Sequence, residues 1–197
     1  MNNNIWKKEG IEMSKVCVFL ADGFEEIEGL TVVDLLRRAG EEVVTVSIMG
    51  RKKIMGSHQI QVMADELFET MDFAQAKLLV LPGGMPGTKY LGAHQPLTDL
   101  LCSWNQEGKL LGAICAAPSV FGDLGILKGK EAVCYPGFEE RLVGASIGKG
   151  AVAVSGNIIT SRGLGTAIDF TAALIERLQS AEKAEEIKKS IIYGLFQ

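Results

Sequence analysis

Short apolar runs alternate along this chain with longer segments of helical periodicity. The runs at residues 16–20, 77–81 and 110–114 lack the polar alternation of a half-exposed strand, so they are typical of strands buried on both faces. Residues 25–39 and 95–106 instead repeat apolar side chains every three or four positions, as amphipathic helices do. We therefore predict an α/β fold in which helices cover both faces of a mostly parallel sheet.

Other patterns predict the elements that surround this sheet. Residues 51–63 turn at a Gly-Ser pair and residues 152–161 turn at a Gly-Asn pair, which predicts two hairpins. Asp22, followed three residues later by Glu25, resembles a capping box that would begin the first helix. The remaining predicted elements are a strand at 42–48, short strand-like pieces within 128–150, and helices at 119–124, at 166–179 and from 180 through Leu195.

Size and charge limit the classes of function. The chain has 197 residues, of which 47% are hydrophobic, enough for one domain with a substantial core. We assign that domain to residues 14–197 and expect the polar residues 1–13 to form a flexible extension. The net charge of −4 includes no basic block, so we expect no nucleic-acid partner. We expect a cytoplasmic protein with no membrane contact, because no run is long enough to span a bilayer and the N-terminus lacks an apolar signal core.

The cysteines and histidines form no metal-binding pattern. Four cysteines are spread without a Cys-x-x-Cys pair, and neither of the two histidines lies near a cysteine in sequence. In a reducing cytosol these cysteines are expected to be free thiols. The lysine and hydroxyl of a phosphate-binding loop are also missing from the glycine-rich turn. We therefore expect neither a metal nor a cofactor.

Cys115 ends the run at 110–114 and is followed by two alanines and Pro118, a residue that fits the first turn of a helix. A cysteine at such a strand-to-helix elbow faces the unpaired N–H groups of the helix, which favour thiolate over thiol. We therefore interpret Cys115 as a nucleophile with a lowered pKa. The alternative is a small buried hydrophobic side chain, which most free cysteines are.

Glu28 is the second residue to which we assign chemistry. On the predicted helix it shares a face with Val32 and Leu35, and both of these side chains are apolar. A carboxylate on a face that meets the core loses hydration, so its pKa should rise. Glu25 and Glu26 are explained more simply as acidic residues that complement the helix dipole. The alternative for Glu28 is a surface acid at the edge of a wide apolar face.

A pair of glycines, Gly83 and Gly84, follows the run at 77–81. Glycines let backbone N–H groups approach a ligand closely, so we predict an oxyanion hole in which the N–H groups of Gly84 and Ala116 converge near the thiol. The alternative is an ordinary tight turn. Because parallel sheets bind ligands beyond the carboxyl ends of their strands, we expect the loops that follow three of the predicted strands to form one site.

Four short motifs carry a family resemblance. They are Ala21-Asp-Gly-Phe-Glu-Glu-Ile-Glu28, Leu81-Pro-Gly-Gly84, Ala113-Ile-Cys-Ala-Ala-Pro118 and Ser161-Arg-Gly-Leu-Gly-Thr166. In this order and at this spacing they resemble the ThiJ/PfpI superfamily, and within it the branch of the parkinsonism-associated protein DJ-1. The resemblance covers nearly all of the chain from Ser14 onward. It implies a flavodoxin-like three-layer sandwich with a nucleophile elbow, and a homodimer.

The resemblance also implies roles for single residues. Cys115 would be the nucleophile, and Glu28 would be held protonated and donate a hydrogen bond to the thiolate. The residues that we expect to line the substrate pocket are Glu25, Met85, Tyr135 and Leu164.

Three positions differ from the pattern of some relatives. Many relatives have a histidine where this chain has Tyr135, and protease-like members have a histidine where it has Ala116. A Cys–His arrangement at those positions is therefore missing, which disfavours peptidase or amidotransferase chemistry. His58 stands where some relatives have an arginine near the pocket, or it is simply exposed in a hairpin turn.

The resemblance implies a glyoxalase or deglycase activity on small α-oxoaldehydes, such as methylglyoxal and glyoxal, or on their thiol and amine adducts. In the mechanism that we expect, Cys115 forms a hemithioacetal and Glu28 moves a proton between two carbons to give a 2-hydroxy acid. The alternative is a redox-sensing stress-response protein with chaperone-like activity, in which oxidation of Cys115 is the signal.

Overall fold

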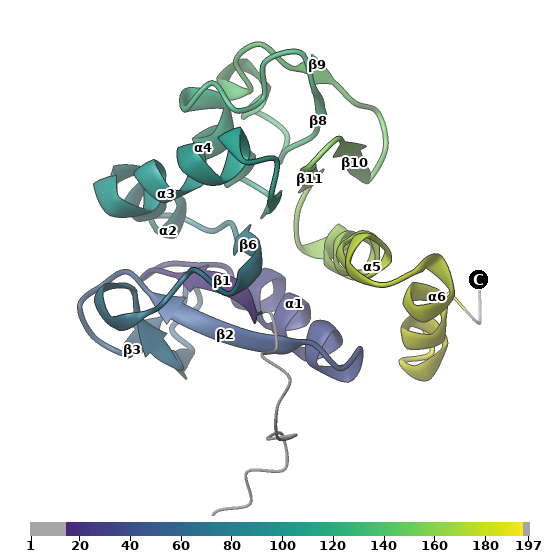
Figure 1. Ribbon diagram of the computed structural model, residues 1–197, viewed down its shortest axis with the longest axis horizontal. Coiled ribbons are helices and arrows are strands. Elements are labelled where there is room, and N and C mark those ends of the chain that lie inside the picture. Colours follow the sequence, from purple (N-terminus) through teal and green to yellow (C-terminus); the bar gives the residue numbers. More distant parts are fainter. Residues whose placement is uncertain (1–14, 195–197) are drawn as a thin grey trace, which may run out of the picture.

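A seven-stranded sheet lies at the centre of the computed structural model, which describes residues 15–194 (Figure 1). The strand order is β10-β11-β7-β6-β1-β2-β5. Each neighbouring pair in this sheet is parallel except β10 with β11. The predicted α/β sandwich with a mostly parallel sheet is therefore confirmed. The predicted extension at residues 1–13 lies outside the described residues.

The strands alternate with helices along most of the chain, as the hydrophobic pattern predicts. The strands of the central sheet are β1 (Lys15–Leu20), β2 (Glu42–Ser47), β5 (Glu66–Leu67), β6 (Ala76–Leu81), β7 (Leu110–Ile114), β10 (Val152–Ser155) and β11 (Ile158–Ser161). Two small sheets consist of β3 (Lys53–Met55) with β4 (Gln61–Met63), and β8 (Glu131–Ala132) with β9 (Ser146–Ile147).

The helices differ widely in length. The α-helices are α1 (Glu26–Arg38), α2 (Gly87–Ala93), α3 (Gln95–Gln106), α4 (Pro118–Asp123), α5 (Ala167–Leu178) and α6 (Ala181–Ser190). The 3-10 turns are η1 (Phe68–Thr70), η2 (Glu139–Arg141) and η3 (Leu164–Thr166). Among residues 15–194, no helix has both the length and the apolar character that crossing a bilayer requires.

Strand β1 shows why both faces of the sheet need cover. Val16, Val18 and Leu20 belong to the hydrophobic core that α1 and α5 close. Cys17 and Phe19 belong to the second core, on the side of α3 and α4. All five side chains are fully buried. Because successive side chains of a strand point to opposite faces, an unbroken apolar run produces two cores and hence three layers.

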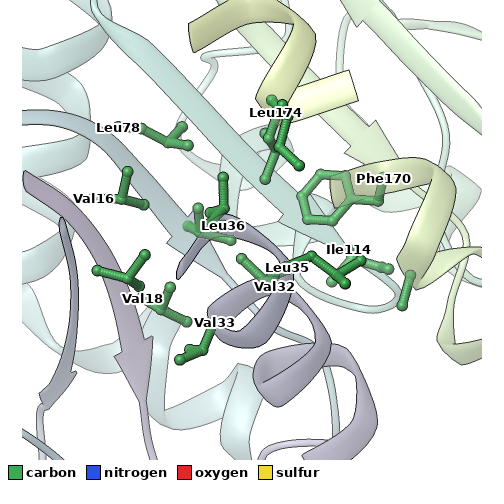
Figure 2. Packing of buried hydrophobic residues seen from close by; sticks show 14 of the residues in the cluster. Val16, Val18, Val32, Val33, Leu35, Leu36, Leu78, Ile114, Phe170 and Leu174 are labelled. Atoms are coloured by element: carbon green, nitrogen blue, oxygen red, sulfur yellow. The ribbon is translucent and has the colours of Figure 1, made fainter. Parts of the chain in front are cut away.

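Helices α1 and α5 contact each other over the first core. Figure 2 shows Val32 and Leu36 of α1 grouped with Phe170 and Leu174 of α5. Gly112 of β7 makes room for α5, because a Cβ atom there would lie 3.1 Å from the Phe170 ring and 3.2 Å from Leu174. This packing fixes α1 against the sheet, and α1 is the helix that carries Glu28.

The predicted capping box at Asp22 is wrong. The N-cap of α1 is Glu25, whose Oε2 accepts the N–H of Glu28 at 2.7 Å. Asp22 instead forms an ion pair with Arg51, and its Oδ1 accepts the N–H of Met55 at 3.0 Å. Asp22 therefore ties the end of β1 to the β3–β4 hairpin, a long-range contact that the local sequence cannot reveal.

Most element predictions are confirmed, and the exceptions are short or terminal. The hairpins β3–β4 and β10–β11 form as predicted. Helix α2 was not predicted, because prolines and glycines precede it, and neither was the two-residue strand β5. The last helix, α6, ends at Ser190, and the predicted position of Leu195 lies outside the described residues.

The core beneath α5 gives a prediction about stability. Phe170→Ala removes a fully buried ring and leaves a cavity, so the free energy of unfolding should fall by about 3–5 kcal/mol, as measured by urea denaturation. The matched control Val143→Ala truncates a side chain that is 59% exposed, and should change the stability by no more than about 0.5 kcal/mol. Equal effects of the two substitutions would contradict this packing.

Candidate functional site

Cys115 lies at a sharp elbow between β7 and α4. Its backbone φ is 65°, in the left-handed region that residues other than glycine seldom adopt. Its N–H donates to the Ser161 carbonyl at 3.0 Å, and its carbonyl accepts the N–H of Tyr135 at 2.8 Å. Pro118 then begins α4. These backbone bonds hold the nucleophile elbow that the sequence predicts. The Cys115 side chain is half-buried, whereas Cys17 and Cys134 are buried.

Three groups meet the Cys115 sulfur. The backbone N–H groups of Ala116 and Gly84 donate to it, and the Glu28 carboxyl shares a hydrogen bond with it. The structure therefore brings together four of the residues that the sequence analysis selected. The stabilisation of an oxyanion by Gly84 and Ala116 stays a prediction.

Glu28 is 1% exposed and lies in the first turn of α1. Its Oε2 accepts the N–H of Gly83 at 2.9 Å, and the N–H of Leu164 also donates to the carboxylate. Burial raises the pKa of Glu28 to about 7, and the charge of Glu25 adds to this increase. The hydrogen bonds from Cys115 and Gly83 act in the opposite direction and are outweighed.

The predicted lowering of the Cys115 pKa is wrong. Burial and the adjacent charge of Glu28 raise the pKa of this thiol to about 12. The N–H groups of Ala116 and Gly84 lower it, as the elbow argument requires, but their effect is smaller. The sequence argument considered the N–H groups of the elbow and left out both desolvation and the carboxyl group that the fold places beside the sulfur.

Glu28 and Cys115 therefore titrate as one pair. Glu28 has the lower pKa and ionises first, and its negative charge then opposes the ionisation of the adjacent thiol. After Glu28 ionises, the pair carries one negative charge, and the Cys115 thiol donates a hydrogen bond to the Glu28 carboxylate. Such a pair combines a nucleophile with an adjacent base.

Gly83 is a site residue that the sequence analysis did not select. A Cβ atom at this position would lie 2.5 Å from the Cβ of Cys115 and 2.6 Å from Oε2 of Glu28. The absence of a side chain at Gly83 therefore lets the carboxyl group and the thiol meet, while its N–H binds the carboxylate. The available signal was the glycine pair itself, of which only Gly84 was given a function.

The four residues expected to line the pocket lie at different places around the pair. The Glu25 carboxylate accepts the backbone N–H of Glu28. The backbone N–H of Leu164 donates to the Glu28 carboxylate, although the Leu164 side chain is half-exposed. The Tyr135 backbone holds the elbow, and its half-exposed ring lies beside Gly163. The chain places exposed Met85 directly after Gly84. Their contact with a substrate stays a prediction.

Glu26 lies in the first turn of α1, where it complements the helix dipole as predicted, but it also has partners outside the helix. It is 2% exposed, and its carboxylate accepts hydrogen bonds from the backbone N–H of His58 at 2.8 Å and from Ser57 Oγ at 3.1 Å. His58 Nδ1 lies 2.9 Å from the same carboxylate. Although burial raises the pKa of Glu26, these hydrogen bonds outweigh it and lower the pKa to about 2.

The histidine rings have partners other than Cys115. His58 is paired with Glu26, and His94 caps α3 by accepting the N–H of Leu97. In residues 15–194, Glu25, Glu26 and His58 form the single cluster whose geometry suits a metal ion. Because hydrogen bonds already occupy the Glu26 carboxylate, we assign no metal to this cluster.

The close contact at Gly83 gives a second prediction. Gly83→Ala should force the Glu28 carboxyl away from the thiol and from the backbone N–H at position 83, which both lower its pKa, so the pH midpoint of Glu28 ionisation, measured by carbon-13 NMR, should move upward from near 7. Gly165→Ala is the matched control, because a Cβ atom there meets nothing within 4 Å, and it should leave the midpoint in place. An unchanged midpoint in Gly83→Ala would show that the contact does not control the ionisation of Glu28.

Comparisons with known proteins identify several relatives of this chain. Residues 14–177 match the model of the DJ-1/PfpI family. Protein dj-1beta of Drosophila melanogaster is 36% identical over 91% of this chain and 98% of that protein. Protein DJ-1 homolog B of Arabidopsis thaliana is 37% identical over 90% of this chain, which spans only 41% of the plant protein.

Solved structures agree with the sequence comparison. Oxidized Toxoplasma gondii DJ-1 has a TM-score of 0.88 and 38% sequence identity, covering 92% of this chain and 99% of that one. Drosophila melanogaster DJ-1beta has a TM-score of 0.86 and 34% identity over 92% of this chain and 99% of its own. With its flavodoxin-like sheet and its elbow cysteine, the chain belongs to the DJ-1/PfpI family.

Proposed function

We propose that this protein converts small α-oxoaldehydes, such as methylglyoxal, or their thiol and amine adducts, into 2-hydroxy acids without a cofactor. The observation that carries this proposal is the buried Glu28 carboxyl against the Cys115 sulfur, with a pKa of about 7. A general acid–base group works best when its pKa lies near the operating pH, because both of its protonation states are then accessible. The reaction requires a nucleophile and a proton shuttle at the same carbon, and this pair supplies both.

The first step forms a hemithioacetal. The Cys115 sulfur attacks the aldehyde carbon, and the shared proton passes to Glu28. The carbonyl oxygen becomes an alkoxide, which the N–H groups of Gly84 and Ala116 are placed to stabilise because both already point at the sulfur. Glu28 then returns the proton to this oxygen and becomes a carboxylate again.

The second step moves hydrogen between two carbons. Glu28 removes the C–H proton of the former aldehyde carbon to give an enediolate and delivers this proton to the neighbouring carbon, while the hydroxyl proton passes from the first oxygen to the second. The first carbon is oxidised to a thioester by two electrons, and the ketone carbon is reduced to an alcohol by the same two. Water hydrolyses the thioester, which releases the 2-hydroxy acid and restores the thiol.

This mechanism predicts that the two residues are both required. Cys115→Ala removes the nucleophile and Glu28→Ala removes the shuttle, so each should lower lactate formation from methylglyoxal by at least about 100-fold. Cys102→Ser is the matched control, since this half-buried thiol lies on α3, and it should retain activity. Full turnover by either alanine variant would refute the mechanism.

A second candidate function has support in the same geometry. Cys115 is half-buried and thus partly open to oxidants, while two backbone N–H groups and a carboxyl group surround its sulfur. These groups suit the oxygen atoms of a sulfinic acid, so oxidation of Cys115 could serve as a stress signal. One structural relative, Toxoplasma gondii DJ-1, is described in its oxidized form. The expected homodimer and cytoplasmic location stay predictions.

Mild peroxide treatment tests the second candidate. Intact mass measurement should show the addition of two oxygen atoms, and peptide mapping should place them on Cys115, because the fully buried Cys17 is protected. Cys115→Ala should show no such addition. Equal oxidation of Cys17 and Cys115 would argue against a dedicated redox site.

A further inference from the structure

The turn between β3 and β4 is fastened to the beginning of α1. The N–H of Ser57 donates to the Phe24 carbonyl at 2.8 Å, and the N–H of Gly23 donates to the Met55 carbonyl at 2.7 Å. A Cβ atom at Gly56 would overlap the carboxyl group of Glu26. The turn is therefore held against the helix that carries Glu28.

His58 lies on this turn and connects solvent with the acidic residues of α1. Its side chain is 68% exposed, yet Nδ1 lies 2.9 Å from Oε2 of Glu26 and 3.8 Å from Oε1 of Glu25. The other oxygen of Glu25 accepts the N–H of Glu28 at 2.7 Å. A continuous set of polar contacts thus runs from the exposed ring to the residue that shares a proton with Cys115.

We propose that His58 is a positioning residue whose charge sets the pH at which the Glu28–Cys115 pair loses its first proton. This proposal rests on the reactive pair of the proposed function but not on the identity of the substrate. A protonated His58 offsets the negative charges of Glu25 and Glu26. A neutral ring leaves these charges to oppose the ionisation of Glu28.

The charged groups around His58 and Glu28 allow the charge of His58 to affect the ionisation of Glu28. Glu25 and Glu26 are the charged groups that face His58 in the described part of the chain, and they come from α1. Glu28 is faced by Glu25 of its own helix and by Cys115 of the elbow. The hydrogen bond to Glu26, and then the charges of Glu26 and Glu25, raise the pKa of His58 above its ordinary value, which favours the charged ring.

Two substitutions separate the charge of His58 from its structural role. His58→Gln keeps a polar side chain but is always neutral, so the pH midpoint of the Glu28 carboxyl carbon, followed by carbon-13 NMR, should move upward by about half a unit. His58→Lys is always charged, so its midpoint should lie at or below that of the wild-type protein. Both shifts should shrink at high salt, because the ring and its replacements are exposed.

His94→Gln is the matched control, because it removes the other histidine from the N-cap of α3 and should leave the midpoint unchanged. The same midpoint in His58→Gln and wild type would overturn the proposal. A shift in the same direction in both His58 variants would also overturn it, since loss of the turn geometry would then explain the effect. A wild-type protein without a midpoint near pH 7 would overturn the reactive pair itself, and this proposal with it.

Discussion

A carboxyl group buried beside a thiol is the interaction on which the site depends. Taken alone, burial would hold Glu28 protonated and would leave Cys115 a weak nucleophile. Together they retain one proton between two atoms, so that a negative charge is available near neutral pH without two charges in a buried place. The backbone donors at Gly83, Gly84 and Ala116 compensate part of the lost hydration.

The fold supplies this pair from segments far apart in the sequence. Helix α1 brings Glu28, the loop after β6 brings the glycine pair, and the elbow after β7 brings Cys115. Because β1, β6 and β7 are adjacent and parallel, the segments that follow them meet at one edge of the sheet. The two cores on opposite faces of β1 hold these strands and helices in place.

The sequence predicts the parts of this account that depend on local pattern. The buried strands, the hairpins, the elbow at Cys115 and the core-facing position of Glu28 follow from hydrophobic periodicity and turn residues. The sequence does not predict what depends on long-range contacts. The sequence explains Glu26 by its place in the first helical turn and does not reveal that the β3–β4 turn binds its carboxylate. Asp22 resembles an N-cap in sequence, but in the fold it pairs with Arg51. The sequence argument lowers the pKa of Cys115, whereas the structure raises it. Part of this difference comes from Glu28, which is distant in sequence and lies beside the thiol only in the fold.

The titration of Glu28 tests the central claim most directly. Carbon-13 NMR of protein labelled at glutamate carboxyl groups, with Glu28 assigned by its loss in Glu28→Gln, gives the pKa of this group in the folded protein. We predict a midpoint near pH 7 for the Glu28 carboxyl carbon. A midpoint near 4.5, the ordinary value for glutamate, would contradict the account, because a carboxylate that ionises freely cannot hold a shared proton at neutral pH.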